Sequence, residues 1–388
     1  MSIAIIKNPE SLFKYFVLLL LLPVIGAFVS FIFNFNFDQS FDNQYLMGDW
    51  LINYSDGGFK RRGLSGSLVF LIQDLTASSL SLILFLMQLT FFVLFLIYYF
   101  KGIWNSKLNF LYISLLLTPI TFMAYPSYAF GFVGRKEIIL FFIFAYYIYY
   151  LKYSEKNLKK EYFIYFLLVF AMLMHELTFF YIPYFIFAGY IQSGKFELKK
   201  VLLFFGSVLI PMIVLVLFGG KVNQGESYAI IAKRGITIDP YGVLEIADSF
   251  SPLKHYMEFW PGYLLYAIVI VAGTLQFTYF LKSNNPDKRN RVLQFFIISI
   301  IFSLPLFVIA IDWGRWIHIH FMLLLLLFSL FLEPLNKSKT YTKDFKIFTR
   351  NNLIALLIVF SSVFWKMDHF KIGINPGGIA KRIITGSF

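Results

Sequence analysis

The run ASSLSLILFLMQLTFFVLFLIYYF, residues 77–100, carries no charged side chain and decides the class of fold. A helix crosses the hydrocarbon core of a bilayer with about 20 apolar residues, so this run predicts a membrane-spanning helix. Comparable runs recur along the chain, and the sequence predicts an all-α, polytopic membrane protein of about 11 spans in a single domain, 1–388. The expected spans are 13–36, 77–100, 108–125, 137–151, 162–174, 177–192, 201–219, 261–281, 292–311, 316–332 and 352–366.

The composition supports this class and excludes several others. Of the 388 residues, 59% are hydrophobic and 14% are charged, which leaves too few charges to solvate the outside of a soluble domain. The absence of cysteine excludes disulfides and thiolate metal sites. The net charge of +13 is dispersed over the loops and does not form a basic groove, so no nucleic-acid partner is expected. No nucleotide-binding fingerprint is present.

The loops between the expected spans fall on two sides. One side receives 20 of the 34 Lys and Arg residues but only 7 of the 21 acidic residues, which marks it as cytoplasmic by the positive-inside rule. The N-terminus is then cytoplasmic and leads into an uncleaved first helix. The opposite face receives loops at about 38–76, 126–136, 220–260 and 312–315, and the C-terminal tail at about 367–388.

The first outer loop, DQSFDNQYLMGDWLINYSDGGFKRRGLSGSLVFLIQD (38–74), places carboxylates beside a cationic triplet. This combination suits chemistry on a lipid-linked phosphate or diphosphate, although a solvated loop with ordinary surface charge is the alternative. Asp49 and Asp56 are candidate general bases toward a sugar hydroxyl. Arg61 and Arg62, which follow Lys60, are suited to forked hydrogen bonds with phosphate oxygens. Residues 65–75 predict an amphipathic helix at the membrane interface.

Two further outer motifs are short. In GRKE (134–137), Arg135 and Lys136 precede a helix N-terminus and predict an anion site; the alternative is an interfacial anchor in which Arg135 pairs with Glu137. His175–Glu176 interrupts an apolar run and forms the expected tip of a hairpin. An ionisable pair there is costly and is therefore a functional-site candidate. Adjacent residues do not share a helical face, so the two side chains should play different parts. The alternative is a structural tie in which an arginine from another loop satisfies Glu176.

The remaining outer loops carry weaker signals. In 220–260, Arg234 lies among tyrosines that could stack on sugar rings, although interfacial aromatics have the same pattern. In IDWGRWIHIH (311–320), Asp312 and Arg315 are spaced to pair on one helical turn. Arg315 is alternatively directed at a diphosphate group.

This pattern of about 11 spans, an acidic first outer loop and arginine-bearing outer loops resembles glycosyltransferases of the GT-C type. Within them it is most similar to the bacterial O-antigen or capsule repeat-unit polymerases of the Wzy class. The resemblance implies a base or metal ligand at Asp49, or else at Asp42 or Asp56. It also implies that arginines engage an undecaprenyl-diphosphate carrier; the matching positions are Arg61, Arg62, Arg135, Arg234 and Arg315.

The expected function is therefore polymerisation of undecaprenyl-diphosphate-linked repeat units at the periplasmic face of a bacterial inner membrane. The expected partners are a lipid-linked glycan donor and acceptor, the bilayer and a chain-length regulator. No cofactor is expected, and a divalent metal is left open. The alternatives are a transferase adding one sugar from a polyprenyl-phosphate donor, a lipid-linked glycan flippase or transporter, and a ligase. The candidate catalytic residues are Asp49, Asp56, His175 and Glu176, and the candidate substrate-binding residues are Arg61, Arg62, Arg135, Lys136, Arg234, Asp312 and Arg315.

Overall fold

The computed structural model describes residues 9–37, 44–121, 134–154, 157–220, 224–238, 252–334, 349–362, 364–367 and 374–376. The chain divides into two compact units. Unit 1 comprises Met1–Ala27, Phe100–Phe132 and Ser251–Phe388, and unit 2 comprises Phe28–Tyr99 and Val133–Phe250. Both are helical; within the described residues the exception is one antiparallel pair of short strands, β1 (Trp365–Met367) and β2 (Ile374–Pro376), in unit 1.

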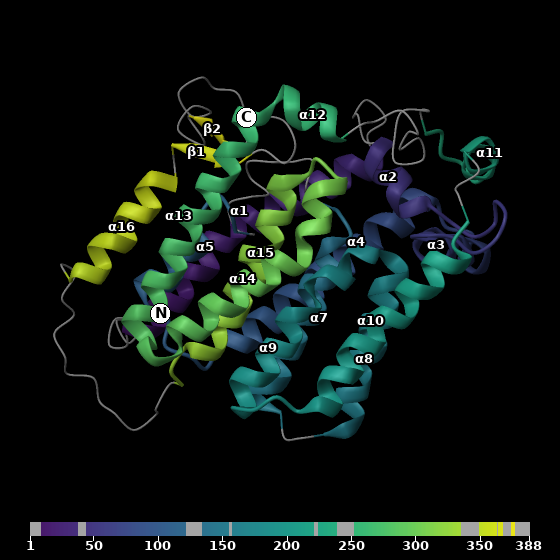
Figure 1. Ribbon diagram of the computed structural model, residues 1–388. Helices are drawn as coiled ribbons and strands as arrows, with labels where there is room; N and C mark the ends of the chain where they lie inside the picture. The colour runs from purple at the N-terminus through teal and green to yellow at the C-terminus, as the bar shows by residue number, and fades with distance from the viewer. Residues whose placement is uncertain are drawn as a thin grey trace, which may run out of the picture. The chain divides into compact units, whose positions relative to one another are not determined.

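Unit 2 is built around α7 (Glu137–Tyr153), which is buried along most of its length. It packs against α8 (Leu158–Met174) and α9 (Ile182–Ser193), and α8 lies beside α10 (Leu198–Phe218) (Figure 1). Aromatic rings fill the space between these helices; the Phe144 and Phe185 ring centroids, for example, are 4.9 Å apart in an edge-on arrangement. The other elements of unit 2 are the C-terminal part of α1 (Pro9–Phe37), α2 (Gln44–Leu51), α3 (Gly63–Thr76), most of α4 (Leu80–Ile103), η3 (Glu176–Tyr181) and α11 (Gln224–Lys233).

Unit 1 is built around α15 (Trp313–Phe328), whose side chains are almost all buried. It packs against α13 (Trp260–Asn284) and α14 (Pro286–Ile309). Gly273 permits a close approach, because a Cβ atom there would lie 2.5 Å from the Phe321 ring. The other elements of unit 1 are α5 (Phe110–Leu116), α12 (Pro252–Glu258), η5 (Ser329–Phe331) and α16 (Arg350–Ser362).

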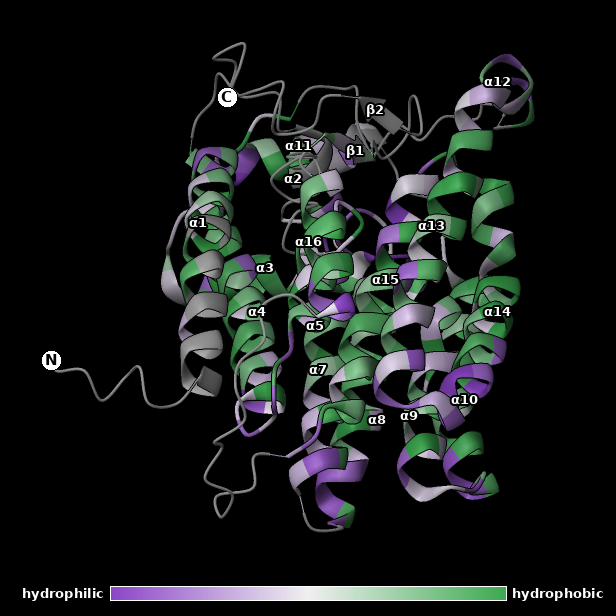
Figure 2. Ribbon diagram, turned by 90° about the vertical axis from the view of Figure 1, so that its left-hand side faces the viewer, coloured by the Kyte–Doolittle hydropathy of each residue, from purple (hydrophilic) through white to green (hydrophobic). Residues whose placement is uncertain are grey.

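The helical class is confirmed, and 5 helices among the described residues are long and apolar enough to cross a membrane. They are α4, α10, α13, α14 and the segment 313–331. Figure 2 shows hydrophobic residues along the middle of the helices and hydrophilic residues gathered at their ends. Large apolar side chains on α10, such as Val216 and Phe218, are exposed, as expected of a surface that faces lipid.

Two of the expected spans are too long. For the span expected at 108–125, α5 ends at Leu116, because Pro119 has no N–H to continue the helix. The Thr121 hydroxyl donates instead to the carbonyls of Leu115 and Leu116, at 2.9 and 3.0 Å. Residues 122–125 lie outside the described residues. The last expected span, 352–366, forms the shorter helix α16, and β1 begins at Trp365.

Candidate functional site

Arg62 joins two carboxylates that come from different parts of unit 2. Its Nη1 donates to Asp49 Oδ1 at 2.8 Å. Its Nη2 and Nε donate to Glu176 Oε1 and Oε2 at 2.7 and 2.9 Å, which is the two-pronged geometry of a strong arginine–carboxylate pair. The Arg62 side chain is 13% exposed, so solvent screens these charges only weakly. We call this set of residues, together with Lys136, the Arg62 cluster.

The backbone of Arg62 adopts an unusual conformation. Its φ is +64°, in the left-handed region, directly before α3 begins at Gly63. In the first turn of α3, Gly63 and Gly66 lie too close to other atoms to carry a side chain. A Cβ atom at Gly63 would lie 2.2 Å from the Tyr54 ring, and one at Gly66 would lie 2.4 Å from the carbonyl oxygens of Leu51 and Ile52. The end of α2 and the start of α3 therefore pack closely and fix where the guanidinium group points.

Lys136, the second cation of the cluster, comes from the turn before α7. Its Nζ donates to the backbone carbonyl of Asp49 at 2.7 Å and lies 3.8 Å from Asp49 Oδ2. Lys136 is 1% exposed, and burial lowers the pKa of its amine to about 8, although the charge of Asp49 opposes this change. Burial alone would raise the pKa of Asp49, but Lys136 and Arg62 together hold it well below its usual range.

His175 connects α8 to η3, and Glu176 is the first residue of η3. Their side chains have different partners, and the pairing of Glu176 with an arginine from another loop is the structural tie that the sequence offered as an alternative. Glu176 binds Arg62, whereas His175 Nδ1 accepts a hydrogen bond from the backbone N–H of Leu177 at 3.3 Å. His175 Nε2 lies 3.8 Å from Glu137 Oε1. Burial and the charge of Arg62 lower the pKa of His175, so the ring is neutral at pH 7. It caps η3 and separates the two carboxylates of Glu137 and Glu176.

Arg61 and Arg135 differ in their access to solvent. The Arg61 side chain is 59% exposed, and its Nε lies 3.7 Å from Glu176 Oε1. Arg135 is buried at the start of α7. Arg61 is thus an exposed cation at the edge of the Arg62 cluster, positioned to meet a ligand that approaches from outside.

Asp56 belongs to a separate buried group. One carboxylate oxygen pairs with Lys60 Nζ, and the other accepts a hydrogen bond from Ser227 Oγ on α11. All three side chains are almost completely buried. Since both oxygens are engaged inside the protein, the geometry of Asp56 is that of a tie between α11 and the loop before α3.

Arg234, which directly follows α11, joins this segment to α3. Its Nη1 donates to Asp74 Oδ1 at 2.7 Å and to Gln73 Oε1 at 3.0 Å. Its guanidinium group lies over the Phe70 ring, 4.3 Å from the centroid. All of these partners lie on α3, so the structure does not bring Arg234 into the Arg62 cluster.

Asp312 and Arg315 belong to unit 1 and form the predicted pair, with Arg315 Nη1 at 3.1 Å from Asp312 Oδ2. The Arg315 guanidinium group also lies 4.9 Å from the centroid of the Trp316 ring. Asp42 and most of the loop that follows α11 lie outside the described residues.

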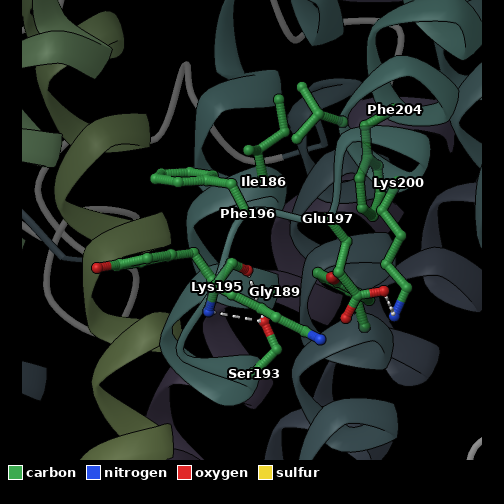
Figure 3. A pocket seen from close by; sticks show the side chains of 11 residues that line it. Ile186, Gly189, Ser193, Lys195, Phe196, Glu197, Lys200 and Phe204 are labelled. Atoms are coloured by element: carbon green, nitrogen blue, oxygen red, sulfur yellow. Dashed lines mark hydrogen bonds and ion pairs between the residues drawn. The ribbon is translucent and has the colours of Figure 1, made fainter.

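A shallow pocket opens elsewhere in unit 2, between α7, α9 and α10 (Figure 3). Its rim carries Ser193 and Lys195 and an ion pair between Lys200 Nζ and Glu197 Oε2 at 3.2 Å. Tyr147, which also lines it, lies about 15 Å along α7 from Glu137 by helical rise. None of the candidate site residues singled out from the sequence lines this pocket.

Two residues near the cluster were missed in the sequence because they lie inside expected spans. Gln88 on α4 donates to the Gly134 carbonyl at 3.1 Å, and Asn36 on α1 donates to Gln88 Oε1 at 2.9 Å. The signal that could have found them is an amide side chain within an apolar run.

Within the described residues, no group of three or more His, Asp or Glu side chains is arranged to hold a metal ion. Comparisons with protein-family models, with curated proteins and with solved structures find no match for this chain.

Proposed function

We propose that this protein is a glycosyltransferase of the bacterial inner membrane that polymerises undecaprenyl-diphosphate-linked oligosaccharide repeat units at the periplasmic face. In this proposal the chain has about 11 spans and a GT-C-like arrangement, with its N-terminus in the cytoplasm. The observation that carries the proposal is the Arg62 cluster. It gathers Asp49, Lys136 and Glu176 from three segments that connect or precede apolar helices.

The proposed reaction needs what this cluster contains. The hydroxyl oxygen of an acceptor sugar attacks the anomeric carbon of the donor, and the bond between that carbon and the diphosphate oxygen breaks. The hydroxyl proton passes to a carboxylate, and polyprenyl diphosphate leaves with one more negative charge. A positioned base accelerates this step by taking the hydroxyl proton, and nearby cations accelerate it by stabilising the charge of the leaving diphosphate.

The geometry favours separate roles for the adjacent arginines. Arg62 makes its hydrogen bonds to Asp49 and Glu176, so it orients the two carboxylates. Arg61 is exposed beside Glu176, and we assign to it the contact with the diphosphate. Glu176 is then the carboxylate nearest the ligand and our first candidate for the base. Asp49 is the second, because Arg62 and Lys136 lie beside it whereas the exposed Arg61 lies beside Glu176. Neighbouring cations hold the pKa of both carboxyl groups below their usual range.

The proposal is tested on the surface polysaccharide of a strain that lacks the gene. Deletion should abolish the polymer ladder while single repeat units still reach the surface, and the intact gene should restore the ladder. Variants Arg61→Ala and Glu176→Gln should fail to restore it at normal membrane levels, whereas the pocket variant Lys195→Ala should restore it fully. An unchanged ladder in the deletion strain would exclude a polymerase.

The same site would also serve a transferase that adds a single sugar. Product length separates the two enzymes, because a polymerase makes a ladder and a single-sugar transferase makes one band. A flippase would leave lipid-linked units on the cytoplasmic side after deletion.

Arg135→Ala and Arg315→Ala should also abolish polymer at normal protein levels, and normal polymer from both variants would remove these arginines from diphosphate binding.

A further inference from the structure

Gln88 is an amide side chain in the middle of α4, a helix apolar enough to span a membrane, and it is completely buried. A polar group in such surroundings is costly unless hydrogen bonds satisfy it, and it often marks a functional constraint. Gln88 Nε2 donates to the carbonyl of Gly134 at 3.1 Å. The acceptor is the first residue of the turn that carries Arg135 and Lys136 to α7.

Asn36 fixes which way the Gln88 amide points. Asn36 Nδ2 donates to Gln88 Oε1 at 2.9 Å and to the Ile32 carbonyl at 2.7 Å. Since the oxygen of Gln88 is taken by this donor, its NH₂ group faces Gly134. Asn36 on α1 thus orients the NH₂ group of Gln88 on α4 so that it donates to the Gly134 turn.

A second donor to the Gly134 carbonyl comes from the residue that follows Asp49. Trp50 Nε1 donates to the same carbonyl at 2.7 Å, and Trp50 follows Asp49 in α2. Gly134 has a φ of +81°, in the left-handed region that favours glycine, and a Cβ atom there would lie 3.4 Å from both Gln88 Nε2 and Ile32 Cγ2. Two residues later, Lys136 Nζ reaches the Asp49 carbonyl at 2.7 Å.

We propose that Gln88, oriented by Asn36, is a positioning residue that holds the Gly134 turn so that Lys136 meets Asp49. Gln88 does not itself touch the Arg62 cluster; it acts through the Gly134 carbonyl. The anchoring of the turn stands on geometry alone, while its consequence for polymer synthesis rests on the proposed function.

The anchoring can be measured without substrate, because the chain contains no cysteine and a single introduced thiol is unique. Ile138 on the first turn of α7 is buried, and Ile138→Cys reports whether this turn stays in place. The rate of labelling by N-ethylmaleimide is compared in detergent-solubilised protein with Gln88, Gln88→Leu or Gln88→Glu. Thr90→Val is the control on the same helix, since the hydroxyl of the exposed Thr90 donates within α4, to the Leu86 carbonyl.

Gln88→Leu should raise the labelling rate about tenfold or more at every pH, and Thr90→Val should leave it unchanged. Gln88→Glu should label slowly at low pH, where the protonated carboxyl donates to Gly134, and quickly at high pH, where it cannot donate. Each rate is taken relative to that of the Gln88 parent at the same pH. Leucine keeps most of the side-chain volume of glutamine but cannot donate a hydrogen bond, so Gln88→Leu tests the donor itself. Gln88→Leu labelling at the parental rate, or a flat Gln88→Glu profile, would overturn the proposal.

The polymer assay then tests the link to function. Gln88→Leu should lower polymer synthesis by about 100-fold, as expected when a catalytic group is misplaced by about 1 Å. Faster labelling of Gln88→Leu together with a normal ladder would show that polymer synthesis does not depend on the position of Lys136. The conclusion that Gln88 anchors the Gly134 turn would still stand.

Discussion

Asp49 and Glu176 share one guanidinium group, because Arg62 donates from Nη1 to the first and from Nη2 and Nε to the second. Two carboxylates so close to each other would repel if no cation lay between them. Arg62 therefore does more than balance charge: it sets the distance and orientation of both acids. This relationship gives the two adjacent arginines, Arg61 and Arg62, different expected phenotypes.

Arg62→Ala should destabilise the protein by about 3–5 kcal/mol, because it removes the cation that the buried Asp49 and the largely buried Glu176 share. Arg61→Ala should cost at most about 1 kcal/mol, since the Arg61 side chain is 59% exposed. The measurement is chemical or thermal unfolding of both variants in detergent. Equal destabilisation by the two substitutions would contradict the assignment of separate roles.

The pKa of about 8 at Lys136 predicts a pH dependence of the proposed activity. As pH rises through about 8, Lys136 loses its proton and Asp49 loses a cation, so polymer synthesis in membrane vesicles should fall. Lys136→Arg should move this alkaline limb upward, because arginine stays charged. An identical profile in Lys136→Arg would show that another group is responsible.

The same lysine should affect stability in the opposite direction. Its pKa in the folded protein lies below the ordinary lysine value of 10.5, so the unfolded state binds more protons between about pH 8 and pH 10.5. The contribution of Lys136 to stability therefore rises over this range while the activity falls. The measurement is the free energy of unfolding at pH 8 and at pH 10. The rise that Lys136 contributes between these pH values should be present in the parent protein and absent in Lys136→Met.

The close packing at α3 predicts that Gly→Ala substitutions at Gly66 and at Gly102 differ strongly in their effect on stability. Gly66→Ala places a methyl group against two backbone carbonyls and should cost about 1–3 kcal/mol. Gly102→Ala on α4 is the matched control, since nothing lies within 4 Å of its added carbon, and it should be neutral or slightly stabilising. Thermal unfolding of both variants decides this, and an unaffected Gly66→Ala would contradict the observed packing.

The Asp56 group can be separated from catalysis by a double substitution. Asp56→Leu alone buries an unpaired Lys60 and should destabilise by about 3–5 kcal/mol. Combining it with Lys60→Met removes both charges and should recover much of this loss, together with polymer synthesis. A stable double variant that makes no polymer would instead give Asp56 a catalytic role.

The sequence predicted much of the fold, because long apolar runs leave few alternatives to helices. The expected span at 137–151 became α7, and the one at 201–219 became α10. The runs at 108–125 and 352–366 were wrong in length, because apolar composition alone does not register a proline-terminated helix or a short strand. Residues 65–75 form part of α3, as the helical pattern predicted.

All members of the Arg62 cluster had been singled out from the sequence as candidates, and the pairing of Glu176 with an arginine from another loop was one of the two alternatives stated for it. Asp49, Arg62, Lys136 and Glu176 were all singled out, since ionisable groups near apolar runs are rare. Which carboxylate each cation binds depends on long-range packing, so neither the shared Arg62 nor the separate Asp56–Lys60 pair followed from the sequence. Gln88 and Asn36 were missed, because an uncharged amide in an apolar run carries a weak signal.

The left-handed backbone at Arg62 has a consequence for engineering. Glycine or asparagine suits that conformation better than arginine, so a redesign that optimises stability residue by residue would replace Arg62. The local gain would remove the one group that both Asp49 and Glu176 bind. Any stabilised version of this protein should therefore keep position 62 fixed and seek its improvements on surfaces far from α3.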